Sequence, residues 1–239
     1  MKIILKYFKK SVLLQQIIFQ LMSSFLRLLI PILLCLATFC VNATPPKDPL
    51  PCLDKKFTIS YIGLLPKQSN PKLLFKVLSI LSLENSDFKK DLEIKFIGDI
   101  SEDVNIEINS YDLSANTSFI GYVSHEKAID YQKKSQVLLL LIPNIEKSEG
   151  ILTGKLFEYL TAKRPILAIG PETGDLSDIL KNTNAGVVLN FDNEERLTSE
   201  IRKLYSQYKT GNLKVDSKNI EQYHRKELTN SLSEIIKSL

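Results

Sequence analysis

Short apolar segments alternate with amphipathic segments of helical spacing from Phe57 onward, and this alternation constrains the fold more than any other feature of the sequence. The strand candidates are FTISYIGLL (57–65), LEIKFIGD (92–99), TSFIGYV (117–123), VLLLLIPN (137–144), PILAIG (165–170) and GVVLNF (186–191). The helix candidates are 70–83, 124–135, 154–162, 175–182, 194–208 and 217–239. Strands that alternate with helices of this length predict βαβ units, and therefore an α/β fold with a mostly parallel sheet and helices on both faces.

The segment VLLLLIPN is apolar over six consecutive residues, as expected of a central parallel strand that is covered on both faces. Ligands of open parallel sheets bind outside the carboxyl ends of the strands. At the ends of four strand candidates stand Gly63, Gly98, Pro143 and Gly170. We therefore expect the binding site of this chain at that edge of the sheet.

The chain divides by charge and by glycine content. All six charged residues among the first 47 are basic, and all nine glycines lie from Gly63 onward. The division predicts a basic and apolar leader over 1–43, a proline-rich linker over 44–56 and a globular domain over 57–239. The globular part has the size of one domain.

The leader contains an uncharged apolar run of 14 residues, 28–41, that Arg27 interrupts at its start. A membrane-spanning helix needs about 20 apolar residues. The leader is therefore compatible with a membrane anchor, with a signal-like segment that would be cleaved after Ala43, or with an amphipathic anchor at a membrane interface. A leader that is not native to the domain is a further alternative. The expected location is a membrane-associated domain that faces the cytoplasm, with a purely cytoplasmic protein as the alternative.

Composition excludes several kinds of site from the globular part. Beyond the first 47 residues, 25 Lys and Arg stand against 27 Asp and Glu, which argues against a broad basic face for nucleic acid. The three cysteines, Cys35, Cys40 and Cys52, lie in or beside the leader, so the domain has no disulfide framework and no thiolate metal site. The sequence contains no D-x-D triplet, and we predict no metal ion and no other cofactor.

The segment EGILTGKLFEYLTAKRPILAIGP, 149–171, predicts a phosphate site at the start of a helix. Thr153 is a suitable N-cap residue, which leaves the amides of Gly154, Lys155 and Leu156 without partners inside the helix. A helix start carries about half a positive charge and binds phosphate groups. The segment is not a P-loop, because three residues instead of four separate its glycines and no Ser or Thr follows the lysine.

Glu158 lies four residues after Gly154, so the two residues share one face of the predicted helix. The distance along the helix is about 5 Å, which is close to the step from a nucleotide's phosphates to its ribose. A carboxylate there can accept hydrogen bonds from ribose hydroxyls. The alternative is a solvated surface glutamate. Leu156, Phe157 and Leu160 are expected to pack on the sheet.

Two segments together resemble a known family. GILTGKLFEYLTAKRPILAIGPETGDLSDILKNTNAG and FIGYVSHEKAIDYQKKSQVLLLLI look like the donor-binding half of glycosyltransferase family 4 enzymes, which have the GT-B fold. The resemblance implies a Rossmann-like domain that binds a nucleotide-sugar. It also implies transfer of the sugar with retention of anomeric configuration.

The resemblance assigns donor-binding roles to individual residues. Glu158 matches the second acid of the family's paired-glutamate motif, whereas Gly150 occupies the place of the first acid and Glu149 is one step away. The donor-binding residues that the resemblance implies are Gly63, Lys67, His125, Thr153, Gly154, Lys155, Leu156 and Glu158. The resemblance identifies no catalytic residue.

A GT-B enzyme works between two Rossmann-like domains, and this chain has room for one. We therefore expect a donor-binding half whose acceptor domain is encoded separately or lost, and whose acceptor is an unidentified saccharide or glycolipid. The alternative is a non-catalytic, membrane-tethered domain that binds nucleotide or acts as a scaffold for another transferase. An epimerase ranks last, because the chain has only two histidines.

Overall fold

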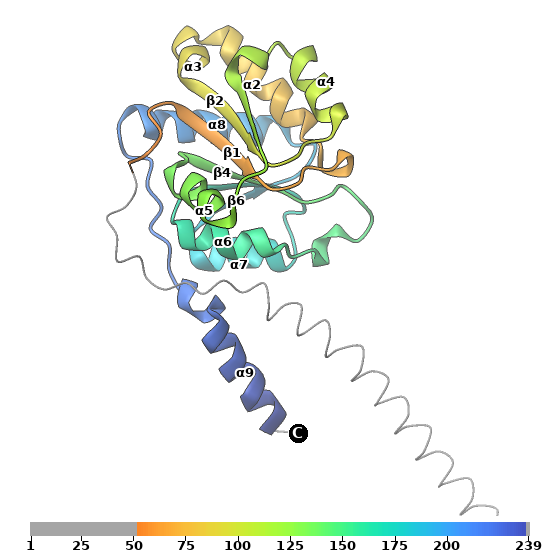
Figure 1. Cartoon of the computed structure of the whole chain (residues 1–239), viewed down its shortest axis with the longest axis vertical. Coiled ribbons are helices and arrows are strands. Elements are labelled where there is room, and N and C mark those ends of the chain that lie inside the picture. The colour runs from red at the N-terminus through yellow and green to blue at the C-terminus, as the bar shows by residue number, and fades with distance from the viewer. Residues whose placement is uncertain (1–51, 238–239) are drawn as a thin grey trace, which may run out of the picture. The chain divides into compact units, whose positions relative to one another are not determined.

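The computed structural model describes residues 52–237. The predicted leader, the expected apolar helix within it and most of the predicted linker lie outside these residues. The described part contains one sheet of six strands, with helices on both of its faces (Figure 1). The expected Rossmann-like α/β fold is confirmed.

The six strands are all parallel and follow the order β3-β2-β1-β4-β5-β6. Their bounds are β1 Phe57–Ile62, β2 Leu92–Ile97, β3 Thr117–Gly121, β4 Val137–Leu141, β5 Ile166–Ile169 and β6 Gly186–Leu189. The chain builds outward from β1 to β3, returns to β4 beside β1, and then builds outward in the other direction. The junction of β1 and β4 is therefore the switch point at which sheets of this order place their ligands.

The helices connect these strands. Their bounds are α2 Lys72–Glu84, α3 Ser86–Asp91, α4 Glu102–Ser110, α5 His125–Lys134, α6 Gly154–Ala162, α7 Asp175–Thr183, α8 Glu194–Lys209 and α9 Arg225–Lys237. The sequence prediction missed α3 and α4. It was also wrong about the start of the last helix, because residues 217–219 are not helical and a 3₁₀ turn, Ile220–Tyr223, precedes α9.

Two apolar layers hold the sheet between the helices. Buried side chains of α2, α3, α4 and α8 pack on one face, and those of α6 and α7, with partly buried residues of α5, pack on the other (Figure 1). Every residue of β4 is buried, as predicted for a central strand, and so is every residue of β1. Two buried hydroxyls of β1 are hydrogen-bonded: Ser60 accepts from Ser135 at 2.7 Å, and Thr58 accepts from the amide of Gln136 at 2.8 Å.

Among the residues of α9 whose side chains are described, none belongs to either layer. Its residues are exposed from 226 to 237. Within 52–237, no helix has the length and apolarity that crossing a lipid bilayer would require.

Candidate functional site

Two glycine turns lie against each other at the carboxyl edge of the sheet. Gly63 and Gly98 have φ angles of +116° and +119°, which side chains of other residues rarely allow. The amide of Gly63 donates to the carbonyl of Ile97 at 2.7 Å. A Cβ atom on Gly98 would lie 2.7 Å from the carbonyl oxygen of Gly63. Both positions therefore require glycine, and the backbone at the ends of β1 and β2 is closely packed.

The structure brings Lys155 to the Gly63 turn. A Cβ atom on Gly63 would lie 2.7 Å from Cε and 2.9 Å from Nζ of Lys155. The ammonium group of Lys155 therefore fits against this turn only because Gly63 has no side chain. Two residues that the sequence predicted for the same site, one after β1 and one at the start of α6, meet in the folded chain.

Tyr61 holds the Lys155 ammonium in place. Nζ of Lys155 donates to the Tyr61 hydroxyl at 2.5 Å and lies 4.1 Å from the centre of the ring. The Tyr61 hydroxyl in turn donates to the carbonyl of Leu64 at 2.7 Å. Burial lowers the pKa of Lys155 to about 8, and the nearby Glu158 carboxylate opposes this effect only in part. An anion bound beside this lysine would favour its charged form.

Tyr159 attaches α6 to the end of β1. The amide of Ile62 donates to the Tyr159 hydroxyl at 3.1 Å, and the Tyr159 side chain is fully buried. Tyr159 lies one helical turn after Lys155, so the same face of α6 supplies both contacts to β1. The sequence analysis expected Phe157 in the buried face. Phe157 does pack against that layer, but it is only partly buried, with its ring 5.9 Å from that of Tyr223.

The start of α6 differs from the expected cap. Thr153 occupies the N-cap position, but its hydroxyl makes no capping hydrogen bond and is buried without a partner among the described residues. The Leu156 amide, expected to point out of the helix, donates to the carbonyl of Thr153 at 3.1 Å. The amides of Gly154 and Lys155 have no hydrogen-bond partner in the described part of the chain. Of the three backbone amides predicted to be free at the start of this helix, two have no partner.

Glu158 faces helix α5. One oxygen of its carboxylate accepts a hydrogen bond from Gln132 at 2.9 Å, and Gln132 is buried. The alternative of a fully solvated glutamate is therefore wrong, because Glu158 is partly buried and has a defined partner. Gly150 and Glu149, at and beside the place of the first family acid, lie in a 3₁₀ turn, Ser148–Gly150.

Lys67 and His125 are not drawn into this cluster. Lys67 forms an ion pair with Asp103 at 3.1 Å on the surface, and His125 is exposed as the first residue of α5. Ser124 caps α5 as predicted, although its bond to the amide of Lys127 is long, at 3.5 Å. Among the described residues, no hydrogen bond or ion pair joins Lys67 or His125 to Lys155 or Glu158.

Sequence reasoning missed three residues that position the site: Tyr61, Gln132 and Tyr159. Tyr61 lies in a segment that was read only for its apolar pattern, whereas Gln132 and Tyr159 lie in helices where other residues were singled out. A polar tip on an otherwise apolar face was the available signal, because a buried tyrosine hydroxyl or amide needs a partner. The sequence does not name that partner, since each pair is joined only in the folded chain.

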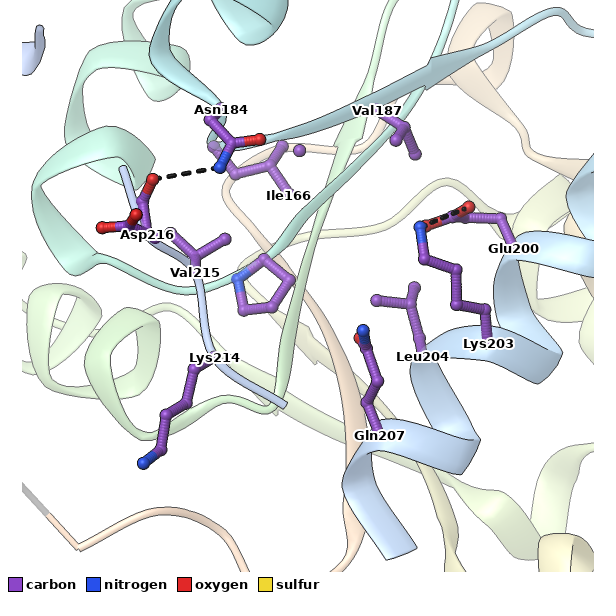
Figure 2. Close-up of a pocket in the computed structure, with 12 residues that line it drawn as sticks. Ile166, Asn184, Val187, Glu200, Lys203, Leu204, Gln207, Lys214, Val215 and Asp216 are labelled. Atoms are coloured by element: carbon purple, nitrogen blue, oxygen red, sulfur yellow. Dashed lines mark hydrogen bonds and ion pairs between the residues drawn. The ribbon is translucent and has the colours of Figure 1, made fainter. Parts of the chain in front are cut away.

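Figure 2 shows a pocket of about 210 Å³ that does not belong to this cluster. Its lining includes Ile166 and Val187, which lie at the amino ends of β5 and β6. It therefore opens at the opposite edge of the sheet. Within 52–237, no three His, Cys, Asp or Glu side chains lie together in a way that could hold a metal ion. That donor binding needs no metal stays a prediction.

Both the sequence and the fold of this chain are similar to those of known proteins. The family model described as "Glycosyl transferases group 1" matches residues 47–226. No curated protein matches the sequence. The solved structure of HepE from Anabaena in complex with UDP and glucose matches with a TM-score of 0.58 and 12% sequence identity, over 77% of this chain and 49% of that one.

Two further structures give the same result. A glycosyltransferase from Rickettsia africae matches with a TM-score of 0.52 and 18% identity, over 81% of this chain and 50% of that one. TarM from S. aureus, in complex with UDP among other ligands, matches with a TM-score of 0.53 and 16% identity, over 78% of this chain and 34% of that one. At these identities the likeness shows the fold alone. The chain spans half or less of the length of each of the three structures.

Proposed function

The chain belongs to the group 1 glycosyl transferase family, and from that premise we propose that it is the donor-binding, C-terminal half of a GT-B enzyme of glycosyltransferase family 4. The proposed reaction moves a sugar from a nucleotide donor to an acceptor with retention of anomeric configuration. The proposed donor-binding residues are those of the carboxyl edge around the start of α6.

The observation that carries the proposal is the meeting of Lys155 with the Gly63 turn at the switch point of the sheet. A diphosphate placed there would lie beside one ammonium group and the two unpartnered amides of Gly154 and Lys155. The start of α6 adds about half a positive charge. These groups are already in place before the reaction, so they can stabilise the charge that develops on the leaving nucleotide.

Glu158 is the proposed ribose contact. Its hydrogen bond from Gln132 occupies one carboxylate oxygen and orients the group, and further acceptor sites on the carboxylate remain for ribose hydroxyls. Lys67 and His125 are weaker members of the proposed site. They would have to move from the positions described above to reach a donor.

The donor class follows from the relatives by analogy. HepE from Anabaena was solved with UDP-glucose, with UDP, and with UDP and glucose. We propose a UDP-sugar as the first donor to test. The acceptor is proposed to be a saccharide or a glycolipid, and a separate acceptor domain would complete the enzyme.

Calorimetric titration of the full chain with UDP, GDP and ADP tests the donor site. We expect measurable affinity for at least one nucleotide. Replacing Lys155 with Met should weaken that affinity about 10-fold to 100-fold, because a hydrogen bond to a charged group contributes roughly 1.5 to 3 kcal/mol. Lys127→Met, an exposed lysine of α5, is the control. Absence of binding to all three nucleotides contradicts the proposal.

The second candidate function is a non-catalytic domain that binds nucleotide or assists another transferase. The observation in its favour is Gly150, which stands where the family's first acid is expected. Incubation of the pure chain with UDP-sugars and simple saccharides separates the candidates. Binding without turnover fits either the non-catalytic domain or a half-enzyme that lacks its partner. Restored turnover on addition of a partner domain supports the half-enzyme.

A further inference from the structure

A second pocket, of about 490 Å³, opens at the amino edge of the sheet, opposite the proposed donor site. The segment before β1, the ends of α5, α6 and α8, and the segment that follows α8 surround it. The end of α8 is tied to the start of the folded chain, because the Tyr208 hydroxyl donates to the carbonyl of Lys55 at 2.6 Å. The pocket is therefore built from the fixed parts of the domain.

Four lysines line this pocket: Lys55, Lys133, Lys163 and Lys214. None of them forms an ion pair with another described residue. Asp54 is the only acidic residue of the lining, and it pairs with Lys95 at 2.9 Å. The neighbouring pocket of Figure 2 differs, because there Lys203 is paired with Glu200 at 3.1 Å. Lys214 lines both pockets, but the lining of the smaller pocket also includes Asp216, so only the larger pocket has an excess of positive charge.

Arg164 adds a fifth positive charge at the wall of the pocket. Its guanidinium group is buried and donates to the backbone carbonyls of Ser135, at 2.7 Å, and Gln136, at 3.1 Å. These carbonyls satisfy its hydrogen bonds but do not neutralise its charge. No carboxylate in the described residues lies within ion-pair distance of it.

The negative ends of nearby helices offset only part of this positive charge. α5, α6 and α8 all end at this pocket, and each helix end carries about half a negative charge that a nearby lysine stabilises. Three helix ends thus offset roughly 1.5 of the five positive charges. The remaining charge favours an anionic ligand. The lining also includes Leu53, Leu213 and Val215, which offer an apolar surface beside the cations.

The leader is not a suitable occupant of this pocket. Its six charged residues up to position 47 are all basic, so the lysines of the pocket would repel it. The described residues begin beside this pocket, because Leu53 belongs to the lining. A basic, apolar leader and a basic pocket with apolar walls are complementary to the same surface, that of an anionic membrane.

We propose that the amino edge of the domain docks on a membrane rich in anionic phospholipid, with the phosphate of one head group bound in the pocket of Lys55, Lys133, Lys163 and Lys214. The carboxyl edge then faces away from the membrane. This inference does not depend on the proposed donor site, which lies at the other edge.

Co-sedimentation of the full chain with phospholipid vesicles tests the docking surface. Vesicles with 30% phosphatidylglycerol in phosphatidylcholine are compared with phosphatidylcholine alone. The triple variant Lys133→Gln, Lys163→Gln and Lys214→Gln should bind the anionic vesicles about a hundredfold more weakly, because each lysine near such a surface contributes roughly fivefold. The matched control is the triple variant Lys72→Gln, Lys127→Gln and Lys147→Gln, at the carboxyl edge, which should bind like the wild type.

Hydrogen exchange locates the contact independently of the leader. On addition of anionic vesicles, amides of 160–166 and 211–215 should become protected, and neutral vesicles should not protect them. The proposal is overturned if the chain binds vesicles without this protection, or if the two triple variants bind equally. It is also overturned if millimolar inorganic phosphate releases the chain at constant ionic strength, since the pocket would then bind free phosphate instead of a membrane.

Discussion

The two edges of the sheet hold positive charge in different ways. At the carboxyl edge the chain holds one partly buried lysine, Lys155, between a tyrosine ring and a glycine turn. At the amino edge it leaves four lysines around an open pocket, without ion-pair partners in the described residues. A partly buried ammonium group loses much of its hydration, so its interaction with a ligand depends strongly on where it is held. An exposed ammonium group keeps its hydration, and neighbouring lysines can take over its contribution to binding.

The difference indicates the kind of ligand that each edge suits. One positioned cation with two aligned amides fits a small ligand whose charges have fixed spacing, such as a diphosphate. Several solvated cations on long side chains fit a surface whose charges are many and mobile. The predictions below test this contrast, from the largest expected effect to the smallest.

Replacement of one glycine by alanine at each edge of the sheet compares how tightly the backbone is packed at the two edges. Gly98→Ala places Cβ 2.7 Å from a backbone oxygen at φ +119°, so we expect a loss of about 3 kcal/mol in the free energy of unfolding. Gly211→Ala, at the amino edge, meets no atom within 4 Å at φ +70° and should cost about 1 kcal/mol. Urea denaturation measures both, and equal losses would remove the packing contrast.

The pH dependence of stability compares the lysines. The folded pKa of Lys155, about 8, lies below its ordinary value of 10.5, so the unfolded chain binds more protons between these values. The contribution of Lys155 to stability should therefore rise with pH in this window, by about 2 kcal/mol between pH 8 and pH 10, against an opposing loss from buried tyrosines such as Tyr61 whose folded pKa is raised. Lys155→Met should abolish this rise.

Lys163→Met, at the amino edge, is the matched control and should retain it. Denaturation curves at several pH values provide the measurement. An identical rise in wild type and Lys155→Met would show that Lys155 is not the group responsible.

Removal of one hydroxyl tests whether Tyr61 positions the cation. Tyr61→Phe keeps the ring under Lys155 but removes the hydrogen-bond acceptor, so nucleotide affinity should fall about fivefold, or about 1 kcal/mol. Tyr208→Phe removes a hydroxyl at the amino edge and should leave nucleotide affinity unchanged. Calorimetric titration measures the nucleotide affinity of both variants. Equal affinities for Tyr61→Phe and the wild type would assign the positioning of Lys155 to the Gly63 turn alone.

The smallest expected effect is that of a chelator. If amides and one ammonium group hold the diphosphate without a metal ion, EDTA should change nucleotide affinity by less than twofold. Calorimetry with and without EDTA checks this. A larger loss would show that the carboxyl edge recruits a metal ion through groups not identified above.

The sequence predicted the architecture well and the site in part. The periods of strands and helices are local features of the sequence, so all six strands and helix α6 were found within a few residues of their bounds. The predicted strands mostly ran too far at their carboxyl ends, past the glycine turn in the case of β1. Helix α4 was missed because its three apolar residues, Val104, Ile106 and Ile108, alternate with polar ones instead of repeating at helical spacing. At the site, the residue types were readable but the contacts of Lys155 with Tyr61 and of Glu158 with Gln132 depend on tertiary packing.

The hydrogen bond between Ile62 and Tyr159 joins the two halves of the sheet at the place where a nucleotide is proposed to bind. β1 ends in the first half of the chain, and α6 follows the first strand of the second half. Neither half on its own can therefore present the glycine turn and the lysine together. If the domain were split between α5 and β4 into two complementary fragments, neither fragment alone should bind nucleotide. Binding should return only when the two fragments reassemble.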